Sequence, residues 1–243
     1  MKKLLALTKR NLLETVRDPL SAVFCIAFPV VMLVFMQLIF TNMEFVPENF
    51  RIENYAMGIC VFGYAFTGMF LAMSVAADKN SSLIKRIELS PIKRSVYLLS
   101  FLLSGLMIAA VQTLLFFALA LLFKLPFDHR LLLAIAYMVP SCVFYLSFGI
   151  LMGVIAKNEK QAGPINSIVI SLTGILGGTF MPLSAFSGWL ATVVNLLPFS
   201  HSVLIASELY SIGAGCIYPH VLYLCFYVAA IWGAIVLKEN LKK

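Results

Sequence analysis

Few residues in this sequence have the types and spacing that covalent chemistry needs. There is no GxxxxGK[ST] loop to cradle nucleotide phosphates, no HExxH metal motif and no GxSxG nucleophile turn. The three histidines, His129, His201 and His220, fall in loops or at the ends of apolar runs, so we expect interfacial or solvated positions for them. The sequence therefore disfavours an enzyme, although Ser200 beside His201 would be the residues to test for one.

The residues best suited to a function are charged rather than nucleophilic, and they gather in one stretch. Residues 78–94 read DKNSSLIKRIELSPIKR and carry five of the eighteen Lys and Arg residues between two long apolar runs. A charge at mid-bilayer costs roughly 2.5–3.5 kcal/mol, so this stretch must lie outside the hydrocarbon, and its basic excess predicts the cytoplasmic side. Aliphatic side chains recur at helical spacing before Pro91, which would end such a helix. The pattern predicts a short helix on the inner membrane face, either a topology anchor alone or a docking surface for a cytoplasmic partner.

The composition identifies an integral membrane protein. Of the 243 residues, 61% are apolar and 12% are charged, and the mean hydropathy is +0.96, whereas soluble domains are roughly 45–50% apolar and 25% charged. The net charge of +7 comes from residues at the ends of apolar runs, which suits membrane lipid and provides no patch for nucleic acid. The five cysteines form no CxxC pair, so we expect buried thiols rather than disulfides or a metal site.

An all-α fold follows from six apolar segments, each near or above the roughly 20 residues that cross about 30 Å of hydrocarbon. Residues 1–18 have the pattern of a basic interfacial helix. Residues 182–215 are apolar but interrupted by proline and glycine, so they predict two short re-entrant outer helices. Pro29 and Pro140 fall inside spans and should kink them. We treat residues 1–243 as one transmembrane domain, whose spans are residues 20–41, 55–77, 96–123, 131–156, 164–181 and 217–237.

The distribution of basic residues predicts the orientation. With the N-terminus in the cytoplasm, fifteen of the eighteen Lys and Arg residues lie inside, and only Arg51, Lys124 and Arg130 lie outside. We therefore expect a multi-pass protein of the cell membrane with both termini in the cytoplasm.

The interiors of the predicted spans lack ionised residues. No Asp, Glu, Lys or Arg falls in the middle of any of the six segments. Ion-coupled transporters usually carry such a residue as a relay or ion ligand, so the sequence disfavours that class. A secondary transporter or channel stays open as an alternative, since Gln37, Gln112 and Asn166 are polar groups at depth.

Small residues follow one side of the fifth predicted span. They fall within about 80° of one another on a helix of 3.6 residues per turn, and they are Gly163, Ser167, Ser171, Gly174 and Gly178. A weaker stripe follows the second span. Such stripes permit close packing of helices within one chain, and they equally suit a translocation path or a dimer interface. The residues assigned to the path or interface are Ala65, Ala72, Asn166, Ser167, Ser171, Thr173, Gly174 and Gly178.

The order of these elements resembles the ABC-2 family of ATP-binding-cassette permeases over essentially the whole chain. The charged stretch between spans two and three ends in a Ser-Pro-x-x-Arg motif, Ser90, Pro91 and Arg94. The segment after span five follows the family's Gly-x-x-x-Pro, Trp-Leu and Asn-to-Pro pattern, which falls here on Gly178, Pro182, Trp189, Leu190, Asn195 and Pro198.

Three positions depart from the family pattern. The turn at residues 78–82 has no glycine, and two leucines separate Asn195 from Pro198. Glu208 stands near where the outer helix often ends in an arginine. These departures affect the substrate subclass rather than the fold.

The resemblance implies a permease subunit of an ATP-driven exporter. Such a subunit pairs with a second permease subunit, identical or related, and docks a cytoplasmic ATPase that would hold the ATP and Mg, so no cofactor is expected on this chain. Residues 1–18 would be the elbow helix and the helix in residues 78–94 the coupling helix. Family members mostly export lipophilic drugs, antibiotics, lipids or glycans. The residues that would dock the ATPase are Leu83, Ile84, Lys85, Arg86, Ile87, Glu88, Ser90, Pro91 and Arg94.

Other classes of protein remain to be distinguished from an exporter. An ion-coupled secondary transporter or channel would need no ATPase, a membrane-embedded enzyme would need His201 or Ser200, and a structural anchor would bind a partner without transport.

Overall fold

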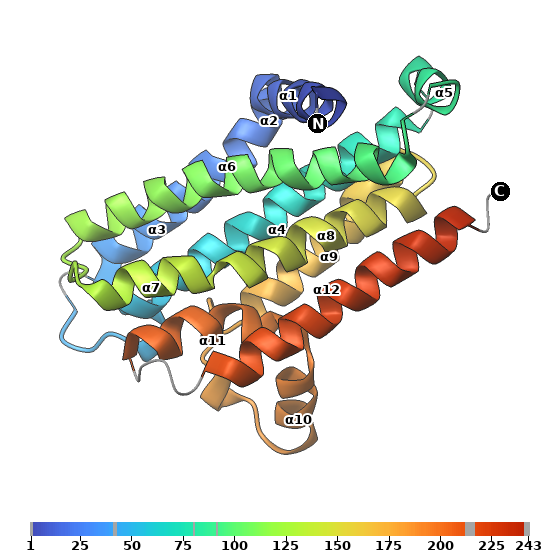
Figure 1. The fold of residues 1–243 in the computed structure, drawn as a ribbon. Coiled ribbons are helices and arrows are strands. Elements are labelled where there is room, and N and C mark those ends of the chain that lie inside the picture. The colour runs from blue at the N-terminus through green and yellow to red at the C-terminus, as the bar shows by residue number, and fades with distance from the viewer. Residues whose placement is uncertain (1, 41–42, 80, 91, 212–216, 241–243) are drawn as a thin grey trace.

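The computed structural model of the chain describes residues 2–40, 43–79, 81–90, 92–211 and 217–240. These residues form helices and no strands (Figure 1). The long and medium helices are α1 Lys2–Arg17, α3 Phe28–Phe40, α4 Ile52–Asp78, α6 Arg94–Leu122, α7 His129–Tyr137, α8 Val139–Ile155, α9 Glu159–Leu176, α10 Gly188–Leu196, α11 Pro198–Ser211 and α12 Ile217–Asn240. The short elements are α2 Pro19–Ala22, the π-helical turn η1 Val23–Ala27, α5 Ser82–Glu88, and the 3-10 turns η2 Glu48–Phe50 and η3 Leu183–Ala185.

Helix α4 is the centre of the bundle. Helices α3, α6, α8, α9 and α11 pack around it (Figure 1). Of its most apolar window, 83% of the residues are buried, against 22% for the segment Pro19–Phe40 and for α12. Helix α4 is therefore shielded by the rest of the chain, whereas α3 and α12 present most of their apolar side chains outward, as lipid-facing helices do.

Helices α4 and α8 approach each other so closely that glycine is required at their contact. A Cβ atom on Gly149 would lie 2.0 Å from the carbonyl oxygen of Gly68, and one on Gly153 would lie 2.7 Å from the carbonyl oxygen of Ala72. Small residues let helix backbones approach in this way. Much of the small-residue content of the second span is thus explained by packing within the chain.

Two of the predicted spans are irregular near their prolines. Residues 20–41 contain α2, η1 and α3 in succession, and the π-helical turn ends two residues before Pro29, which has no N–H to donate to the preceding turn. Residues 131–156 contain α7 and α8, which meet at Met138, two residues before Pro140.

An all-helical membrane fold is confirmed, while the six-span arrangement stays a prediction. Among the described residues, five segments are long and apolar enough to cross a membrane, or six if the pair α10 and α11, bent by 78°, counts as one. Helix α9 is not among the five, because its first turn is polar. It lies against α4 and α8 along the bundle (Figure 1) and begins five residues earlier than predicted.

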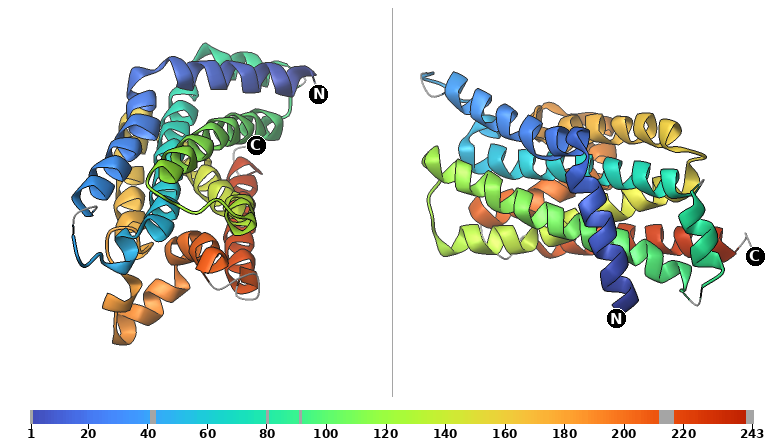
Figure 2. Two further views of the ribbon diagram at one scale, coloured as in Figure 1. Left: turned by 90° about the vertical axis from the view of Figure 1, so that its left-hand side faces the viewer. Right: turned by 90° about the horizontal axis from the view of Figure 1, so that it is seen from above.

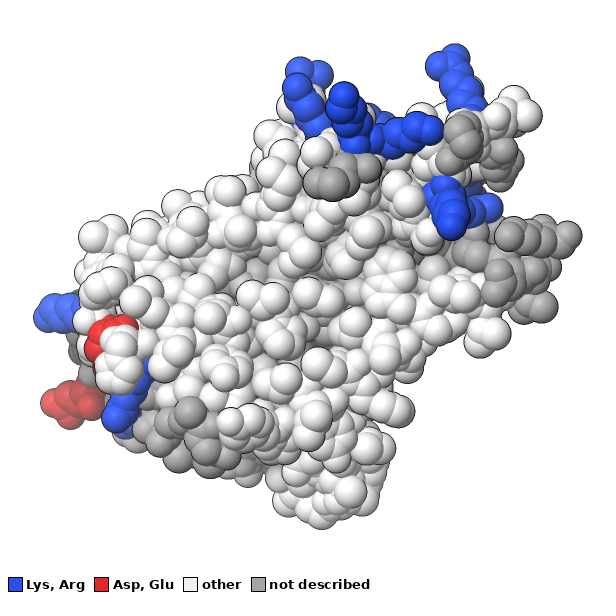
Figure 3. All heavy atoms as spheres, viewed as in Figure 1, with Lys and Arg blue, Asp and Glu red and all other residues white. Residues whose placement is uncertain are grey.

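Charge is sorted between the two ends of the bundle. Figure 3 shows blue side chains over the end that carries α1 and α5, a side wall almost free of charge, and mixed charges at the opposite end. Helix α1 runs across the long helices at the first end (Figure 2). We call these the α1–α5 end and the α10–α11 end, after the helices that lie there.

Cysteine burial is mixed. Cys25, Cys60 and Cys142 are buried free thiols, as expected. Cys225 is exposed on α12, so the expected burial is wrong there, and Cys216 lies outside the described residues.

Candidate functional site

The last residue of α4 joins three helices at the α1–α5 end. The guanidinium of Arg10 on α1 donates two hydrogen bonds to the carboxylate of Asp78, at 2.6 Å to Oδ2 and 2.8 Å to Oδ1. The hydroxyl of Tyr97 on α6 donates to the same Oδ2 at 3.0 Å. Asp78 is only 5% exposed, and such two-pronged, charge-assisted contacts are among the stronger and more directional hydrogen bonds in proteins.

A second contact ties α1 to α6 beside the first. The side-chain amide of Asn11 donates to Ser100 Oγ at 2.9 Å, and the Ser100 hydroxyl donates to the carbonyl of Tyr97 at 2.6 Å. Both side chains are buried. Consecutive residues of α1 therefore bind α4 and α6, which fixes α1 across the ends of both helices.

Neighbouring charges and burial have opposite effects on the pKa values of Arg10 and Glu14 on α1. The hydrogen bonds to Asp78 raise the pKa of Arg10 above its usual value, against the effect of burial. Burial raises the pKa of Glu14, which the charge of Arg10, 2.9 Å away, partly offsets. Arg10 thus stays charged, and Asp78 rather than Glu14 is its main partner.

Lys79 extends the junction to a fourth helix. Its ammonium donates to the carbonyl oxygens of Val154 and Ala156, at the end of α8. Carbonyls in the last turn of a helix lack intrahelical donors and carry partial negative charge, so a lysine there both caps and stabilises α8. Asp78 and Lys79 together hold α1, α6 and α8 at the end of α4.

Helix α5 begins four residues after Asp78. The hydroxyl of Ser81 donates to the carbonyl of Asp78 and accepts from the N–H of Leu83, which turns the chain from α4 into α5. Ile84 and Ile87 are buried against the core, whereas Leu89, just after the helix, is 91% exposed.

The docking residues that the sequence predicted differ in how exposed they are. Ile84 and Ile87 face the bundle, so they position α5 and are not free to contact a partner. The outward face carries Ser82, Arg86 and Leu89, which are spaced four and three residues apart. Leu83, Ser90 and Arg94 are half-buried. Pro91 and the side chains of Lys85 and Glu88 lie outside the described residues.

The fold separates the residues of α9 that the sequence assigned to a path or dimer interface into buried and exposed ones. Asn166, Thr173 and Gly174 are buried, whereas Ser167 and Ser171 are exposed and donate to carbonyls four residues earlier on α9. Gly178 lies beyond the helix, with a φ of +85° that suits glycine.

Two further predicted positions, Ala65 and Ala72, lie inside the bundle. They are 4% and 0% exposed, and Ala72 packs with the small residues of α8 and α9. These alanines therefore contact the chain's own helices and no surface that a second subunit could reach in this conformation.

The expected solvated or interfacial positions are wrong for two histidines and right for His129, which is exposed. His201 and His220 are 7% and 8% exposed, and their Nδ1 atoms lie 2.6 Å apart. His201 Nε2 lies 2.8 Å from the carbonyl of Asn195, and His220 Nε2 lies 3.0 Å from Glu208. No local pattern in the sequence indicates this contact, because it joins α11 to α12.

The histidine pair does not support the hypothesis of a membrane-embedded enzyme. The hydroxyl of Ser200 donates to the carbonyl of Val194 at 2.8 Å rather than to a histidine. Among the described residues, no three His, Cys, Asp or Glu side chains are placed to hold a metal ion.

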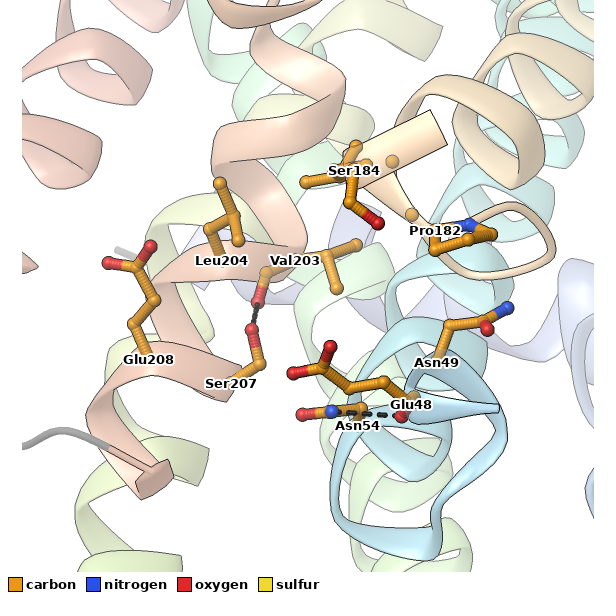
Figure 4. Close-up of a pocket in the computed structure, with 12 residues that line it drawn as sticks. Glu48, Asn49, Asn54, Pro182, Ser184, Val203, Leu204, Ser207 and Glu208 are labelled. Carbon is orange, nitrogen blue, oxygen red and sulfur yellow. Dashed lines mark hydrogen bonds between the residues drawn. The ribbon is translucent and has the colours of Figure 1, made fainter. Parts of the chain in front are cut away.

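A hollow of about 310 Å³ opens at the α10–α11 end. Figure 4 shows Glu48 of η2 pointing toward Ser207, while Glu208 points away from Glu48. Glu208 is the carboxylate that contacts His220. The two carboxylates therefore do not converge on a common point in the hollow.

The apolar helices and the basic end together identify the class of protein. The chain has at least five apolar helices that could span a membrane, a basic end with a short helix held by an ion-pair junction, and no nucleotide motif. It is a polytopic membrane protein with a positively charged end. The chain belongs to the ABC-2 type transporter family, whose model matches residues 2–209. It is therefore the membrane permease part of an ABC transporter.

Two relatives illustrate the family at low identity. A probable doxorubicin resistance ABC transporter permease protein, DrrC, of Mycobacterium tuberculosis is 20% identical over 199 residues, which cover 81% of this chain and 72% of the relative. ABC transporter G family member 20 of Dictyostelium discoideum is 22% identical over 188 residues, which cover 76% of this chain and 26% of that protein.

Proposed function

We propose that this chain is the permease subunit of an ATP-driven exporter and that α5 docks a separate cytoplasmic ATPase. The observation that carries the proposal is the junction at Asp78 and Lys79, which links the start of α5 to α1, α6 and α8. A partner that moves α5 would move these helices with it. Transport driven by a soluble ATPase requires such a mechanical connection.

The docking surface is the outward face of α5 and its surroundings. Arg86 and Leu89 are exposed on that face, and Lys93 is exposed nearby. A cationic residue next to an exposed leucine suits a partner groove that has an apolar floor and an acidic rim. ATP and Mg would be bound by that partner and not by this chain.

The translocation path would form with a second permease subunit, identical or related. On α9, Ser167, Ile168, Ser171 and Leu172 are exposed along one side of the helix. This side provides small and apolar surface without charge, which suits a helix partner or a lipophilic substrate.

The substrate class is inferred from the family. The doxorubicin resistance in the name of the mycobacterial relative favours a lipophilic drug or antibiotic, and lipid or glycan-type substrates are the other candidates. The basic α1–α5 end would face the cytoplasm of a cell whose plasma or inner membrane holds the chain.

Charge reversal on α5 tests the docking proposal. The variant Arg86→Glu with Leu89→Asp should reduce recovery of a soluble ATPase subunit, by roughly tenfold or more, in a mild-detergent pull-down from the native membrane. Arg130→Glu is the matched control, since it reverses an exposed arginine at the opposite end. Equal recovery of the ATPase with both variants would overturn the proposal.

One observation favours the alternative of an ion-coupled carrier. Gln112 is fully buried, its Oε1 accepts from Thr67 at 3.1 Å, and its Nε2 has no partner among the described residues. Substrate flux in proteoliposomes that contain no ATPase, driven by an ion gradient and lost in Gln112→Leu, would establish that alternative.

A further inference from the structure

A charged groove opens at the α10–α11 end of the bundle, between the ends of α3 and α6. Its volume is about 820 Å³, within the roughly 300–1,000 Å³ of small-molecule sites. Both basic and acidic side chains line it, namely Arg51, Lys124, Glu44 and Glu53. Arg51 and Lys124 are two of only three Lys or Arg residues in the segments that connect the spans at this end.

These four side chains share the groove without neutralising one another. No ion pair joins any of them to another side chain within the described part of the chain. Figure 3 shows positive and negative groups close together at this end. The groove thus presents two positive and two negative groups, a balance that matches a ligand with one group of each sign.

The edge of the groove is apolar and reaches the side wall of the bundle. Leu38 near the end of α3 is 59% exposed, Leu122 at the end of α6 is 78% exposed, and Phe45 is 78% exposed. Side chains this apolar and this exposed, at the ends of helices that could cross a membrane, are positioned to contact acyl chains. A ligand in the groove would therefore have a charged head and apolar tails.

Lys124 occupies a backbone position that favours glycine. Its φ is +67°, and it follows α6 in a Schellman motif, in which Leu125 N–H donates to the carbonyl of Ala120 and Lys124 N–H to that of Leu121. A side chain in this conformation costs roughly 1 kcal/mol relative to glycine. Residues held in such conformations are enriched at ligand-binding sites, and the lysine here extends the positive side of the groove.

We propose that this groove binds a membrane phospholipid with a primary-amine headgroup, such as phosphatidylethanolamine. Arg51 and Lys124 would bind the phosphodiester, and Glu44 and Glu53 would accept hydrogen bonds from the ammonium. The acyl chains would lie along the exposed faces of α3 and α6. An anionic headgroup without an amine would leave the carboxylates of Glu44 and Glu53 without a positive partner. A choline headgroup has no N–H group to donate to them. The proposal does not depend on ATPase docking.

Native mass spectrometry of the full chain, purified in mild detergent with its accompanying subunits, tests the proposal. At equal concentrations, dioleoyl phosphatidylethanolamine should bind roughly tenfold more tightly than dioleoyl phosphatidylcholine or phosphatidylglycerol. Soluble glycerophosphoethanolamine should displace it only at far higher concentration, because it lacks the acyl chains. Equal binding of the three lipids, preference for phosphatidylglycerol, or ready displacement by the soluble headgroup would overturn the proposal.

Matched variants test which side chains bind the phosphodiester and which bind the ammonium of the headgroup. Arg51→Gln with Lys124→Gln should lower binding of all phospholipids about tenfold, whereas Glu44→Gln with Glu53→Gln should remove only the preference for ethanolamine over choline. Arg130→Gln and Glu48→Gln alter charges at the same end that do not line the groove, and they should leave lipid binding unchanged. A loss in these controls as large as in the groove variants would contradict the assignment.

Lys124→Gly separates lipid binding from folding. The glycine relieves the backbone strain, so the variant should melt no lower than the native protein while binding about threefold to tenfold less phosphatidylethanolamine. Undiminished lipid binding in this variant would remove Lys124 from the site.

Discussion

The two ends of the bundle are held together by different chemistry. At the α1–α5 end, a buried carboxylate, Asp78, binds a guanidinium 68 residues away in the sequence through two short hydrogen bonds. At the α10–α11 end, α11 and α12 meet through two imidazole rings and the partly exposed carboxylate of Glu208. A guanidinium–carboxylate pair joins one end, and two imidazole rings with one carboxylate join the other.

The difference between the contacts at the two ends agrees with the role proposed for each end. A face that receives force from an ATPase must transmit displacement, and a charged, two-pronged junction of four helices resists being pulled apart. The opposite end contains the bent pair α10 and α11, the hollow beside Glu48 and the charged groove. We expect the bend between α10 and α11 to make that end the easier one to deform during transport.

The largest expected effect is at Asp78. Asp78→Asn keeps the shape but leaves the half-buried Arg10 without its main counter-charge, so we expect a loss of about 3 kcal/mol in the free energy of unfolding. Thermal unfolding in detergent measures it. In the double variant Arg10→Gln with Asp78→Asn the losses should be less than additive.

Glu14→Gln provides the control for the charge of Arg10. The Glu14 side chain is 48% exposed, so its ion pair with Arg10 is largely screened by solvent, and burial of the rest of the side chain raises the pKa of its carboxyl. Removing the charge should therefore change stability by only about 0.5 kcal/mol. If Asp78→Asn is no more destabilising than this control, the junction does not hold the α1–α5 end together.

Lys79→Met should have the next largest effect. The carbonyls of Val154 and Ala156 lose their ammonium donor, at an expected cost of about 1–2 kcal/mol. Hydrogen exchange should increase selectively in the last turn of α8. Lys93→Met, which removes an exposed lysine, is the control, and equal exchange in the two variants would show that Lys79 does not cap α8.

Glu208→Gln tests the opposite end and should have a smaller effect, about 0.5 kcal/mol, because an amide can still form a hydrogen bond with His220 Nε2. Glu208→Leu, which cannot, should cost about 1–2 kcal/mol. The measurement is thermal unfolding at pH 8. A loss from Glu208→Gln as large as that from Asp78→Asn would mean that both ends depend on an ion pair, and the contrast between them would fail.

Ser167→Ala and Ser171→Ala should have the smallest effect on folding, within about 0.5 kcal/mol, because both hydroxyls are exposed and bond only within α9. If the exposed side of α9 borders the path, transport should change while the melting temperature does not. A lower melting temperature in these variants would instead indicate a packing role.

The sequence predicted part of the candidate site. It located the helix in residues 78–94, because charge between apolar runs is a local signal. Of the nine docking residues that it proposed, the fold buries Ile84 and Ile87, and the fold exposes Leu89, which was not among the nine. The amphipathic spacing of α5 did indicate two faces. Which face meets the bundle depends on the helices beside it, and the sequence does not carry that information locally.

The functional residues that the sequence reasoning missed are those with distant partners. From the sequence, Asp78 and Lys79 are interpreted as loop charges and Arg10 as one basic residue of an interfacial helix, because each partner lies in another helix. His201 and His220 looked solvated for the same reason. One signal was available: Asp78 and Lys79 directly follow an apolar run, where a charged pair is well placed to bind neighbouring helix ends.

The sequence by itself determined that the chain is a helical membrane protein of the ABC-2 kind with most of its positive charge at one end. These properties depend on apolar run length, charge distribution and motif order, which are read along the chain. The tertiary structure alone decided that α4 is the buried centre, that Asp78 joins α1 to α6, and that two of three scarce basic residues line one groove. Those outcomes depend on how helices distant in sequence pack side by side, and packing is settled by the shapes of facing side chains rather than by any pattern within one helix.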